Sequence, residues 1–310
     1  MNDTQKSNSQ QKSDNKKELN TSKKSNSVQK FTITDFIKRY PTDDACLDEL
    51  FKLKYSNADG CTSCGVAGAK FYRVRKRKCY ECGECGHQVY PLAGTVMEKT
   101  NTKLSLWFFA IYLFASSKNG VSAKELQRQL GVTYKTAWRM GHLIRIMMGS
   151  NEMPLKGIVQ IDETLFGGRA RGGKRGWGAA KKSCLFGMME KDGRVKVTIV
   201  PNRHNSTLMP IITDNINVGS MIHSDEYKGY GKLESYGYGH KSVIHSKFQW
   251  AKDGVTTNSI EGYWSNLKKS IFGTHTYVSP EYLQNYLNEF DFRHNNRKGR
   301  IMFDAILSRI

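Results

Sequence analysis

Three acidic residues stand where a metal-dependent phosphoryl-transfer site would need its ligands. Asp162 and Asp225 each end an apolar run that is typical of a buried strand. Glu261 lies further on, in the helix-like stretch 258–268. Two strand ends can lie side by side at one edge of a sheet, where the pleat fixes their side chains. Carboxylate oxygens are the ligands that Mg²⁺ and Mn²⁺ prefer, and two such ions about 4 Å apart stabilise both oxygens of an in-line displacement at phosphorus. The sequence therefore predicts a catalytic site that holds two Mg²⁺ or Mn²⁺ ions.

A polar stripe on the helix-like stretch adds to this prediction. Lys268 follows Glu261 by seven residues, or two helical turns, so both side chains project from nearly the same face, which Asn258 shares. A lysine beside a metal–carboxylate cluster can hold a nucleic-acid phosphate as a point charge. An ordinary solvated helix face would look the same, and the two strand-end aspartates favour the catalytic interpretation.

The charge of the chain indicates a polyanionic partner. Its 310 residues include 48 Lys and Arg against 28 Asp and Glu, which gives a net charge of +20. The longest apolar run, residues 104–115, is too short to span a bilayer, and residues 1–30 lack the apolar segment of a secretory signal. We therefore expect nucleic acid and no membrane as the partner, and a cytoplasmic, nucleoid-associated protein whose cysteines are metal ligands or thiols.

Two Cys-x-x-Cys pairs predict a zinc site. Cys61 and Cys64 are separated from Cys82 and Cys85 by 17 residues, a spacing typical of four-cysteine zinc modules. A glycine follows each pair and suits a tight turn. A module with so little core gains most of its folding free energy from the metal, on the order of 10 kcal/mol. Cys79 also begins a Cys-x-x-Cys with Cys82 and is an alternative ligand.

Three basic segments are predicted to contact DNA. Residues 121–140 have the pattern helix, turn, helix, with Ser122 as an N-cap and Gly131 in the turn, although a plain helical hairpin would fit too. The hairpin between the cysteine pairs and the glycine-rich loop 167–182 are rich in Lys and Arg, and a loop of this kind can also be merely solvated. The residues predicted to bind DNA are Arg73, Arg75, Lys76, Arg77, Tyr134, Lys135, Thr136, Arg139, Arg169, Arg171, Lys174 and Arg175.

Together these motifs resemble a known family, the bacterial insertion-sequence DDE transposases with an N-terminal zinc ribbon, or ISXO-type group. The resemblance covers residues 31–296. The motifs that carry it, besides the cysteine pairs, are Ile161-Asp162-Glu163-Thr164, Ser224-Asp225, His245-Ser246, residues 258–264 with Lys268, and the closing set Phe290, Phe292, Arg293 and Asn295.

The resemblance implies an α/β protein with an RNase H-like mixed-sheet catalytic domain, preceded by a small zinc ribbon and a helical helix-turn-helix region. In that fold the first strand carries one aspartate, the fourth strand carries the second, and a later helix carries the third ligand. This implies that Asp162, Asp225 and Glu261 hold the metal, with Asn258 one turn earlier as the alternative third residue. Glu163 would point to the opposite face of its strand.

The resemblance also implies a function and a domain order. We expect a transposase that cleaves DNA and transfers strands at the terminal inverted repeats of an insertion sequence, acting on double-stranded DNA as a homodimer or larger assembly. Alternatives are an RNase H-like nuclease that does not join strands, and a zinc-ribbon regulator with an inactive core. The expected order is a disordered basic tail (1–30), a helical lead-in (31–54), the zinc ribbon (55–98), the helix-turn-helix region (99–150), the catalytic domain (155–300) and a C-terminal extension (301–310).

Overall fold

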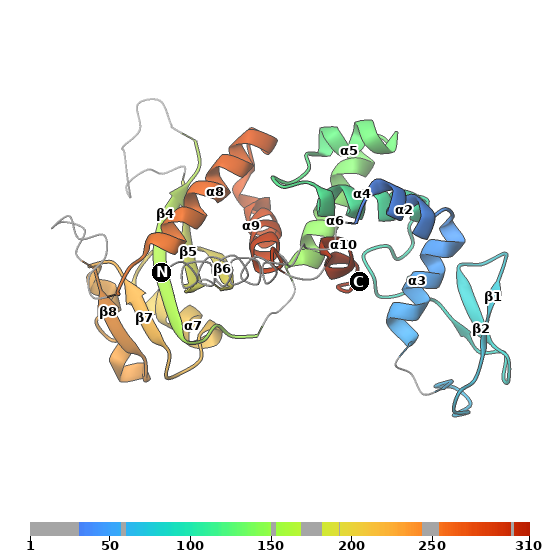
Figure 1. Cartoon of the computed structure of the whole chain (residues 1–310), viewed down its shortest axis with the longest axis horizontal. Helices are drawn as coiled ribbons and strands as arrows, with labels where there is room; N and C mark the ends of the chain where they lie inside the picture. The colour runs from blue at the N-terminus through green and yellow to red at the C-terminus, as the bar shows by residue number, and fades with distance from the viewer. Residues whose placement is uncertain are drawn as a thin grey trace, which may run out of the picture.

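The computed structural model describes residues 31–56, 60–149, 153–168, 182–191, 193–243, 254–298 and 301–310. The predicted N-terminal tail and the His245-Ser246 motif lie outside these ranges. Figure 1 shows a small β-module at one end, a helical region in the middle and a larger sheet with covering helices at the other end. None of the described helices is long and apolar enough to cross a membrane.

The helical region combines segments from both ends of the chain. Its helices are α2 (Ile33–Arg39), α3 (Asp43–Tyr55), α4 (Leu104–Ser116), α5 (Ala123–Leu130), α6 (Tyr134–Met148) and α10 (Met302–Leu307). The apolar helix α4 forms the centre, and its Trp107, Phe108 and Phe114 are almost completely buried. Phe303 of α10 packs into the same core beside Phe108. The last residues of the chain are therefore part of this core.

Helices α5 and α6 and the turn between them lie where the sequence predicted them. The Ser122 side chain accepts a hydrogen bond from the backbone N–H of Glu125 (3.1 Å) and caps α5. Gly131 ends α5 with φ +64°, a left-handed conformation that favours glycine. Thr133 caps α6 by accepting from the backbone N–H of Thr136 (3.3 Å).

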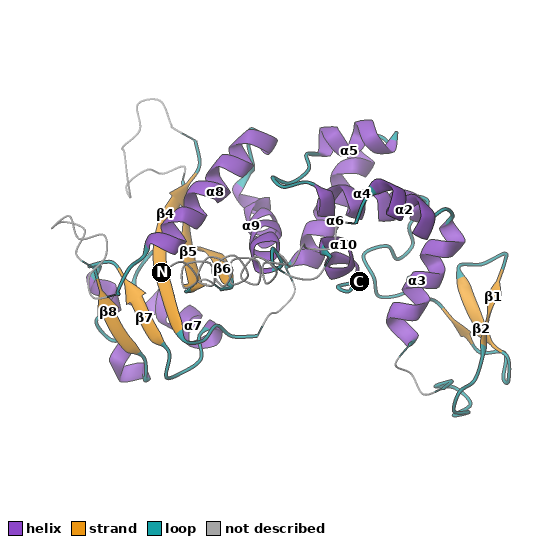
Figure 2. Cartoon of the chain, viewed as in Figure 1, coloured by secondary structure: helices purple, strands orange, loops and turns teal. Residues whose placement is uncertain are grey.

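The small β-module is a three-stranded antiparallel sheet. Its strands are β1 (Phe71–Val74), β2 (Cys79–Cys82) and β3 (Gln88–Val89). Phe51 of α3 stacks on Tyr80 of β2 with ring centroids 4.2 Å apart, which joins the module to the helical region. Figure 2 shows this module beyond α3, with turns and loops making up much of it.

The large sheet has five strands in the order β6-β5-β4-β7-β8. The strands are β4 (Ile158–Phe166), β5 (Ser183–Glu190), β6 (Val195–Val200), β7 (Met221–Ser224) and β8 (Gly239–Ser242). β4, β5 and β6 form an antiparallel meander, and β7 and β8 then run parallel to β4. The crossover from β6 to β7 passes through α7 (Asn205–Asn215). A meander followed by parallel strands on the other side of the first strand is the RNase H-like arrangement, so the predicted fold class is confirmed.

Helices cover both faces of this sheet. On one face, α7 buries Leu208 and Ile212 against the apolar side chains of β4, β5 and β7. On the other face lie α8 (Asn258–His275) and α9 (Pro280–Asn295), which Figure 1 shows in front of β4 and beside β5 and β6. Burial on both faces explains why β5 is apolar over most of its length.

The prediction that Asp162 ends its strand was wrong. β4 continues to Phe166, because β5 pairs with it along its whole length. Only the parallel pairing with β7 stops early, and its last pair is Gln160 with His223. Asp162 therefore lies where β4 keeps one neighbouring strand and has lost the other.

Candidate active site

Alternate residues of β4 form a polar row that faces α8. Gln160, Asp162 and Thr164 are spaced two apart, so their side chains leave the same face of the strand. Each makes a hydrogen bond to a successive part of α8. This row fixes the position of the helix that carries Glu261 relative to the strand that carries Asp162.

Gln160 binds the first turn of α8. Its side-chain oxygen accepts hydrogen bonds from the backbone N–H groups of Ser259 and Ile260, both at 3.1 Å. Thr257, the N-cap residue, makes no side-chain capping bond to the helix backbone. Gln160, which is completely buried, thus satisfies two N–H groups that lack a partner within the helix.

Trp264 lies over Asp162. Its indole N–H donates to the carboxylate of Asp162 at 2.9 Å. Gly187 is the partner of Asp162 on β5, and a Cβ atom there would lie 2.5 Å from the Trp264 ring. The glycine therefore makes room for the tryptophan that holds the carboxylate.

The environment of Asp162 disfavours its negative charge. The pKa of Asp162 is raised from 3.8 to about 6, chiefly by burial and also by the nearby carboxylates of Asp225 and Glu261, against the opposing effect of the Trp264 hydrogen bond. The three predicted metal-site carboxylates thus interact electrostatically, although they come from β4, the end of β7 and α8. A bound divalent cation would reverse this repulsion, so the donor set fits Mg²⁺ or Mn²⁺.

Asp225 comes directly after β7. The register pairs Gln160 with His223, so two residues further along both strands Asp162 and Asp225 are at equivalent positions. One carboxylate oxygen of Asp225 accepts a hydrogen bond from the backbone N–H of Tyr227 at 3.0 Å. This bond fixes the turn that leaves the sheet at the site.

Glu163 lies on the other face of β4. It is 8% exposed and accepts a hydrogen bond from the hydroxyl of Tyr230 at 2.6 Å. Burial raises the pKa of Glu163 to about 7, with further contributions from Asp225 and Asp162. Its position follows from the alternation of side chains along a strand.

The three carboxylates lie near one another without being in ligand contact. We compared the metal-binding atoms of the acidic, histidine and cysteine side chains in the described part of the chain. Three or more of these atoms lie within 4.8 Å of one another in the four-cysteine cluster of the β-module, and the three carboxylates do not form such a group. Glu261 accepts a hydrogen bond from the Thr257 hydroxyl at 2.8 Å, within its own helix. The carboxylates of Asp162, Asp225 and Glu261 thus do not all lie within 4.8 Å of one another.

The two other predicted site residues on α8 point in different directions. Lys268 donates to the Thr164 hydroxyl at 2.6 Å, on the same side of the helix as Asp162. Burial lowers the pKa of Lys268, and the charge of Asp162 opposes that effect. Asn258 is exposed and lines a cavity on another side of α8. Of the two candidates for the third residue, Glu261 is the one whose charge contributes to the raised pKa of Asp162.

The four predicted zinc ligands form one cluster. The Sγ atoms of Cys61, Cys64, Cys82 and Cys85 all lie within 4.8 Å of one another. Gly65 and Gly86, with φ near +70°, donate to the carbonyls of the first cysteine of each pair at 2.8 and 3.0 Å. Four thiolates on two such turns are the donor set of a structural Zn²⁺.

Cys79 does not belong to this cluster. It is completely buried in β2, and its Sγ lies 3.8 Å from the side-chain oxygen of Gln88. The donor geometry therefore favours the four-cysteine assignment over the alternative that includes Cys79.

The predicted DNA-binding residues of the β-module differ in their surroundings. Arg73 donates to Asp44 at 2.9 Å and to the Cys79 carbonyl at 3.3 Å, so its guanidinium is used inside the protein. Arg77 is exposed and donates to Gln88 at 3.3 Å. The remaining two, Arg75 and Lys76, are exposed at the turn between β1 and β2.

The predicted residues on α6 share one end of the helix. Tyr134, Lys135 and Arg139 are exposed, and Thr136 is half-buried beside Thr133. Four further predicted residues lie outside the described part of the chain: Arg169, Arg171, Lys174 and Arg175.

Sequence reasoning missed the neutral partners of the carboxylates. None of Gln160, Thr164 and Trp264 was predicted to contact the site. A signal was present, because a buried-type strand with Gln, Asp and Thr at alternate positions has a polar face that needs partners. The sequence could not identify those partners on α8, about 100 residues away.

An RNase H-like domain with carboxylates where its first and fourth strands part is the architecture of polynucleotidyl transferases. Residues 154–295 match the ISXO2-like transposase domain, and residues 41–88 match the transposase zinc-ribbon domain. The two matches together span more than half of the chain. The protein belongs to the family of ISXO2-like transposases with an N-terminal zinc ribbon, as its motifs predicted.

Two curated relatives agree with this family. The chain is 24% identical to an uncharacterized protein in transposable element ISH50 of Halobacterium salinarum, over 83% of this chain and 92% of the relative. It is 27% identical to an uncharacterized transposase-like protein of Haemophilus influenzae, over 33% of this chain and 82% of the relative.

Solved structures show only weak similarity. The catalytic core domain of BIV integrase has a TM-score of 0.32 and 12% identity, over 49% of this chain and 94% of that chain. The Mos1 strand transfer complex has a TM-score of 0.23 and 11% identity, over 64% and 77% of the two chains. The family assignment rests on the sequence matches.

Proposed function

We propose that this transposase cuts DNA at the terminal inverted repeats of an insertion sequence and joins the freed ends to target DNA. The observation that carries the proposal is the electrostatic interaction of Asp162 with Asp225 and Glu261. A buried carboxylate with two further carboxylates near it, at the edge of an RNase H-like sheet, is suited to divalent cations.

We assign the roles of the side chains as follows. Asp162 and Asp225 hold the metal ions, Glu261 completes one of the two sites, and Lys268 holds a DNA phosphate beside them. Bound Mg²⁺ or Mn²⁺ ions supply the positive charge that stabilises the attacking and leaving oxygens at phosphorus. Trp264 keeps the Asp162 carboxylate in place by its hydrogen bond.

The proposed reaction has two steps. Water attacks a phosphodiester at the end of the element, and the 3′ oxygen leaves and takes up a proton. The resulting 3′-hydroxyl then attacks a phosphodiester of the target, loses its proton and displaces the target's own 3′ oxygen. Positioning and charge stabilisation supply the catalysis, so no covalent bond between protein and DNA is required.

DNA recognition is assigned to the N-terminal half. The zinc ribbon and the helix-turn-helix would bind the terminal repeats as double-stranded DNA, with Tyr134, Lys135 and Arg139 of α6 directed to a major groove. Their exposure supports this assignment. Because two ends must be cut together, we propose a homodimer or larger assembly on DNA.

The test uses a plasmid that carries the DNA flanking the coding region as the two element ends. Asp162→Asn, Asp225→Asn and Glu261→Gln should each abolish Mg²⁺-dependent cleavage while DNA binding is retained. Asp214→Asn, which changes an exposed carboxylate of α7, is the matched control and should cleave normally. Joined products in the wild-type reaction distinguish a transposase from a nuclease. Cleavage that survives Asp162→Asn would contradict the proposal.

A further inference from the structure

A cavity of about 510 Å³ lies against α8 on a different side from Asp162. Its lining includes Asn258, Asn266 and Ser270 of α8, but neither Trp264 nor Lys268, which contact β4. The other walls come from the end of α9 and from the loop that joins α4 to α5. The cavity is therefore formed where the large sheet's helices meet the helical region.

The lining of the cavity is cationic. Lys118 contributes from the loop, and Arg293 and Arg297 contribute from α9 and the turn after it. No aspartate or glutamate is among the described residues that line it. Cations and amide side chains without any carboxylate suit an anion that carries several phosphates.

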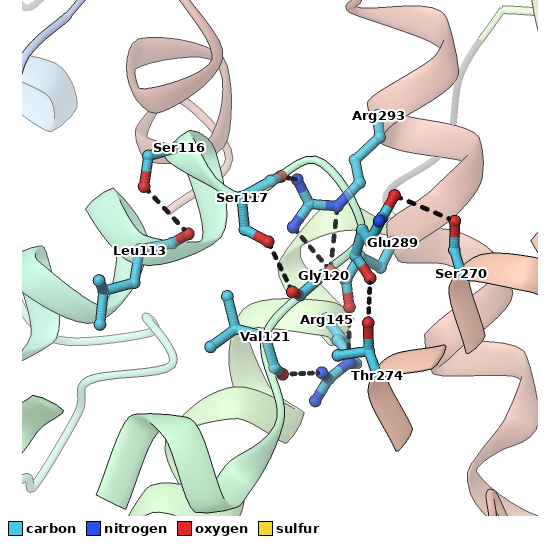
Figure 3. A network of polar contacts seen from close by, with 11 residues as sticks. Leu113, Ser116, Ser117, Gly120, Val121, Arg145, Ser270, Thr274, Glu289 and Arg293 are labelled. Carbon is cyan, nitrogen blue, oxygen red and sulfur yellow. Dashed lines mark hydrogen bonds and ion pairs between the residues drawn. The ribbon is translucent and has the colours of Figure 1, made fainter. Parts of the chain in front are cut away.

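Arg293 joins two of the walls, the loop and α9, and belongs to a network of buried ion pairs, as Figure 3 shows. Arg293 donates to the Ser117 carbonyl at 2.6 Å and to the buried Glu289 at 2.7 Å. Glu289 also accepts from Arg145 of α6 at 2.8 Å. Two guanidinium groups share one carboxylate, so the wall keeps a net positive charge.

Hydrogen bonds attach the loop to α8 as well. The backbone carbonyl of Asn119 accepts from the Thr274 hydroxyl at 3.0 Å, and its side chain lies 3.4 Å from the Ser270 hydroxyl. Lys118 is thus exposed on a loop whose next residue is fixed at two points. The backbone that carries this cation therefore loses little conformational freedom when an anion binds.

The cavity extends toward the carboxylate site. Along α8 it runs from Asn258 to Ser270, about 18 Å at the helical rise of 1.5 Å per residue. This length corresponds to about five steps of one strand of B-form DNA at 3.4 Å per step. Asn258 precedes Glu261 by only three residues, so a strand in the cavity ends within one helical turn of the site.

We propose that this cavity binds the phosphate backbone of one DNA strand that continues into the carboxylate site, with Lys118 and Arg297 as its phosphate-binding cations. The proposal rests on the proposed function, because it takes the bound polyanion to be the DNA that is cut. It adds a binding surface outside the zinc ribbon, the two helices of residues 121–140 and the glycine-rich loop.

The test measures binding without chemistry. A fluorescently labelled DNA duplex of fixed sequence is titrated with Lys118→Ala/Arg297→Ala in magnesium-free buffer, from about 50 to 200 mM salt. The loss of two phosphate contacts should lower the slope of log affinity against log salt by about 1.8, because each contact contributes about 0.9 on duplex DNA. The matched control is Lys156→Ala/Lys232→Ala, which removes two exposed charges near the strands of the large sheet and away from the cavity. It should leave the slope unchanged.

Two results would overturn the proposal: a wild-type slope in the cavity variant, or an equal decrease in both double variants. Lys118→Ala alone changes an exposed side chain, should fold normally, and should lower the slope by about 0.9. The Asp162→Asn protein tests the proposed function separately. Its cleavage depends on the metal site, whereas the salt slope depends on the cavity.

Discussion

The Asp162 carboxyl should destabilise the metal-free protein at neutral pH, and Asp162→Asn should remove this effect. The pKa of Asp162 is raised from 3.8 to about 6, first of all by burial. A group with a higher pKa in the folded state binds its proton more tightly there. The protonated carboxyl therefore contributes its full share to the free energy of unfolding below about pH 4. This contribution is lost as the pH rises through about 6. Two pKa units correspond to about 3 kcal/mol.

Urea unfolding at pH 4 and pH 8 measures this effect. Magnesium-free buffer without a chelator leaves the zinc ribbon intact at pH 8, and loss of zinc by protonation of the cysteines at pH 4 affects both proteins equally. Asparagine has the size of aspartate and keeps an oxygen that can accept the Trp264 N–H, but it carries no charge. At pH 4, the large sheet and its covering helices should have nearly the same free energy of unfolding in both proteins. At pH 8 the variant should be more stable by about 3 kcal/mol.

The control and the effect of metal sharpen the test. Asp214→Asn changes an exposed carboxylate and should alter the free energy of unfolding by less than about 0.5 kcal/mol at either pH. Mg²⁺ should stabilise the wild type at pH 8 and have a much smaller effect on Asp162→Asn, because only the charged site binds it well. The reasoning would be refuted if Asp162→Asn were no more stable than the wild type at pH 8. It would also be refuted if the variant's gain in free energy of unfolding were the same at pH 4 and pH 8.

Three further predictions concern the surroundings of the site and the two supporting regions. Gly187→Ala places a Cβ atom 2.5 Å from the Trp264 ring, so we expect a loss of about 1–3 kcal/mol in chemical denaturation and weaker cleavage. Cys61→Ser should reduce the zinc content measured by atomic absorption and weaken DNA binding, whereas Cys79→Ser should retain the zinc. Glu289→Gln leaves two buried guanidinium groups without their carboxylate and should lower the free energy of unfolding by about 3–5 kcal/mol in urea titrations.

Features set by short stretches of sequence could be predicted. The spacing of Cys61, Cys64, Cys82 and Cys85 determines a metal cluster because each pair is one tight turn. The two helices around Gly131 are likewise set by caps and a turn that involve neighbouring residues. In such cases each turn or cap is formed by residues only a few positions apart, so composition and spacing contain the necessary information.

Features that depend on contacts between distant segments could not be predicted in detail. Asp162 was expected at a strand end because its apolar run stops there, but pairing with β5 extends the strand to Phe166. The contact between Trp264 and Asp162 was not predicted: the tryptophan is buried in the core, and the helix is turned so that its N–H also reaches β4. Both outcomes depend on the register between segments far apart in the chain, which one sequence does not reveal.

The position of α8 explains how neighbouring carboxylates can be tolerated. Repulsion among Asp162, Asp225 and Glu261 favours moving the helix away from the sheet, and burial of Asp162 adds to that cost. Neutral groups oppose it: Gln160 binds the first turn of α8, and Asn119 binds the other end through Ser270 and Thr274. The elements that carry the charges are thus fixed independently of the charges, so the acidic site can exist before any cation binds.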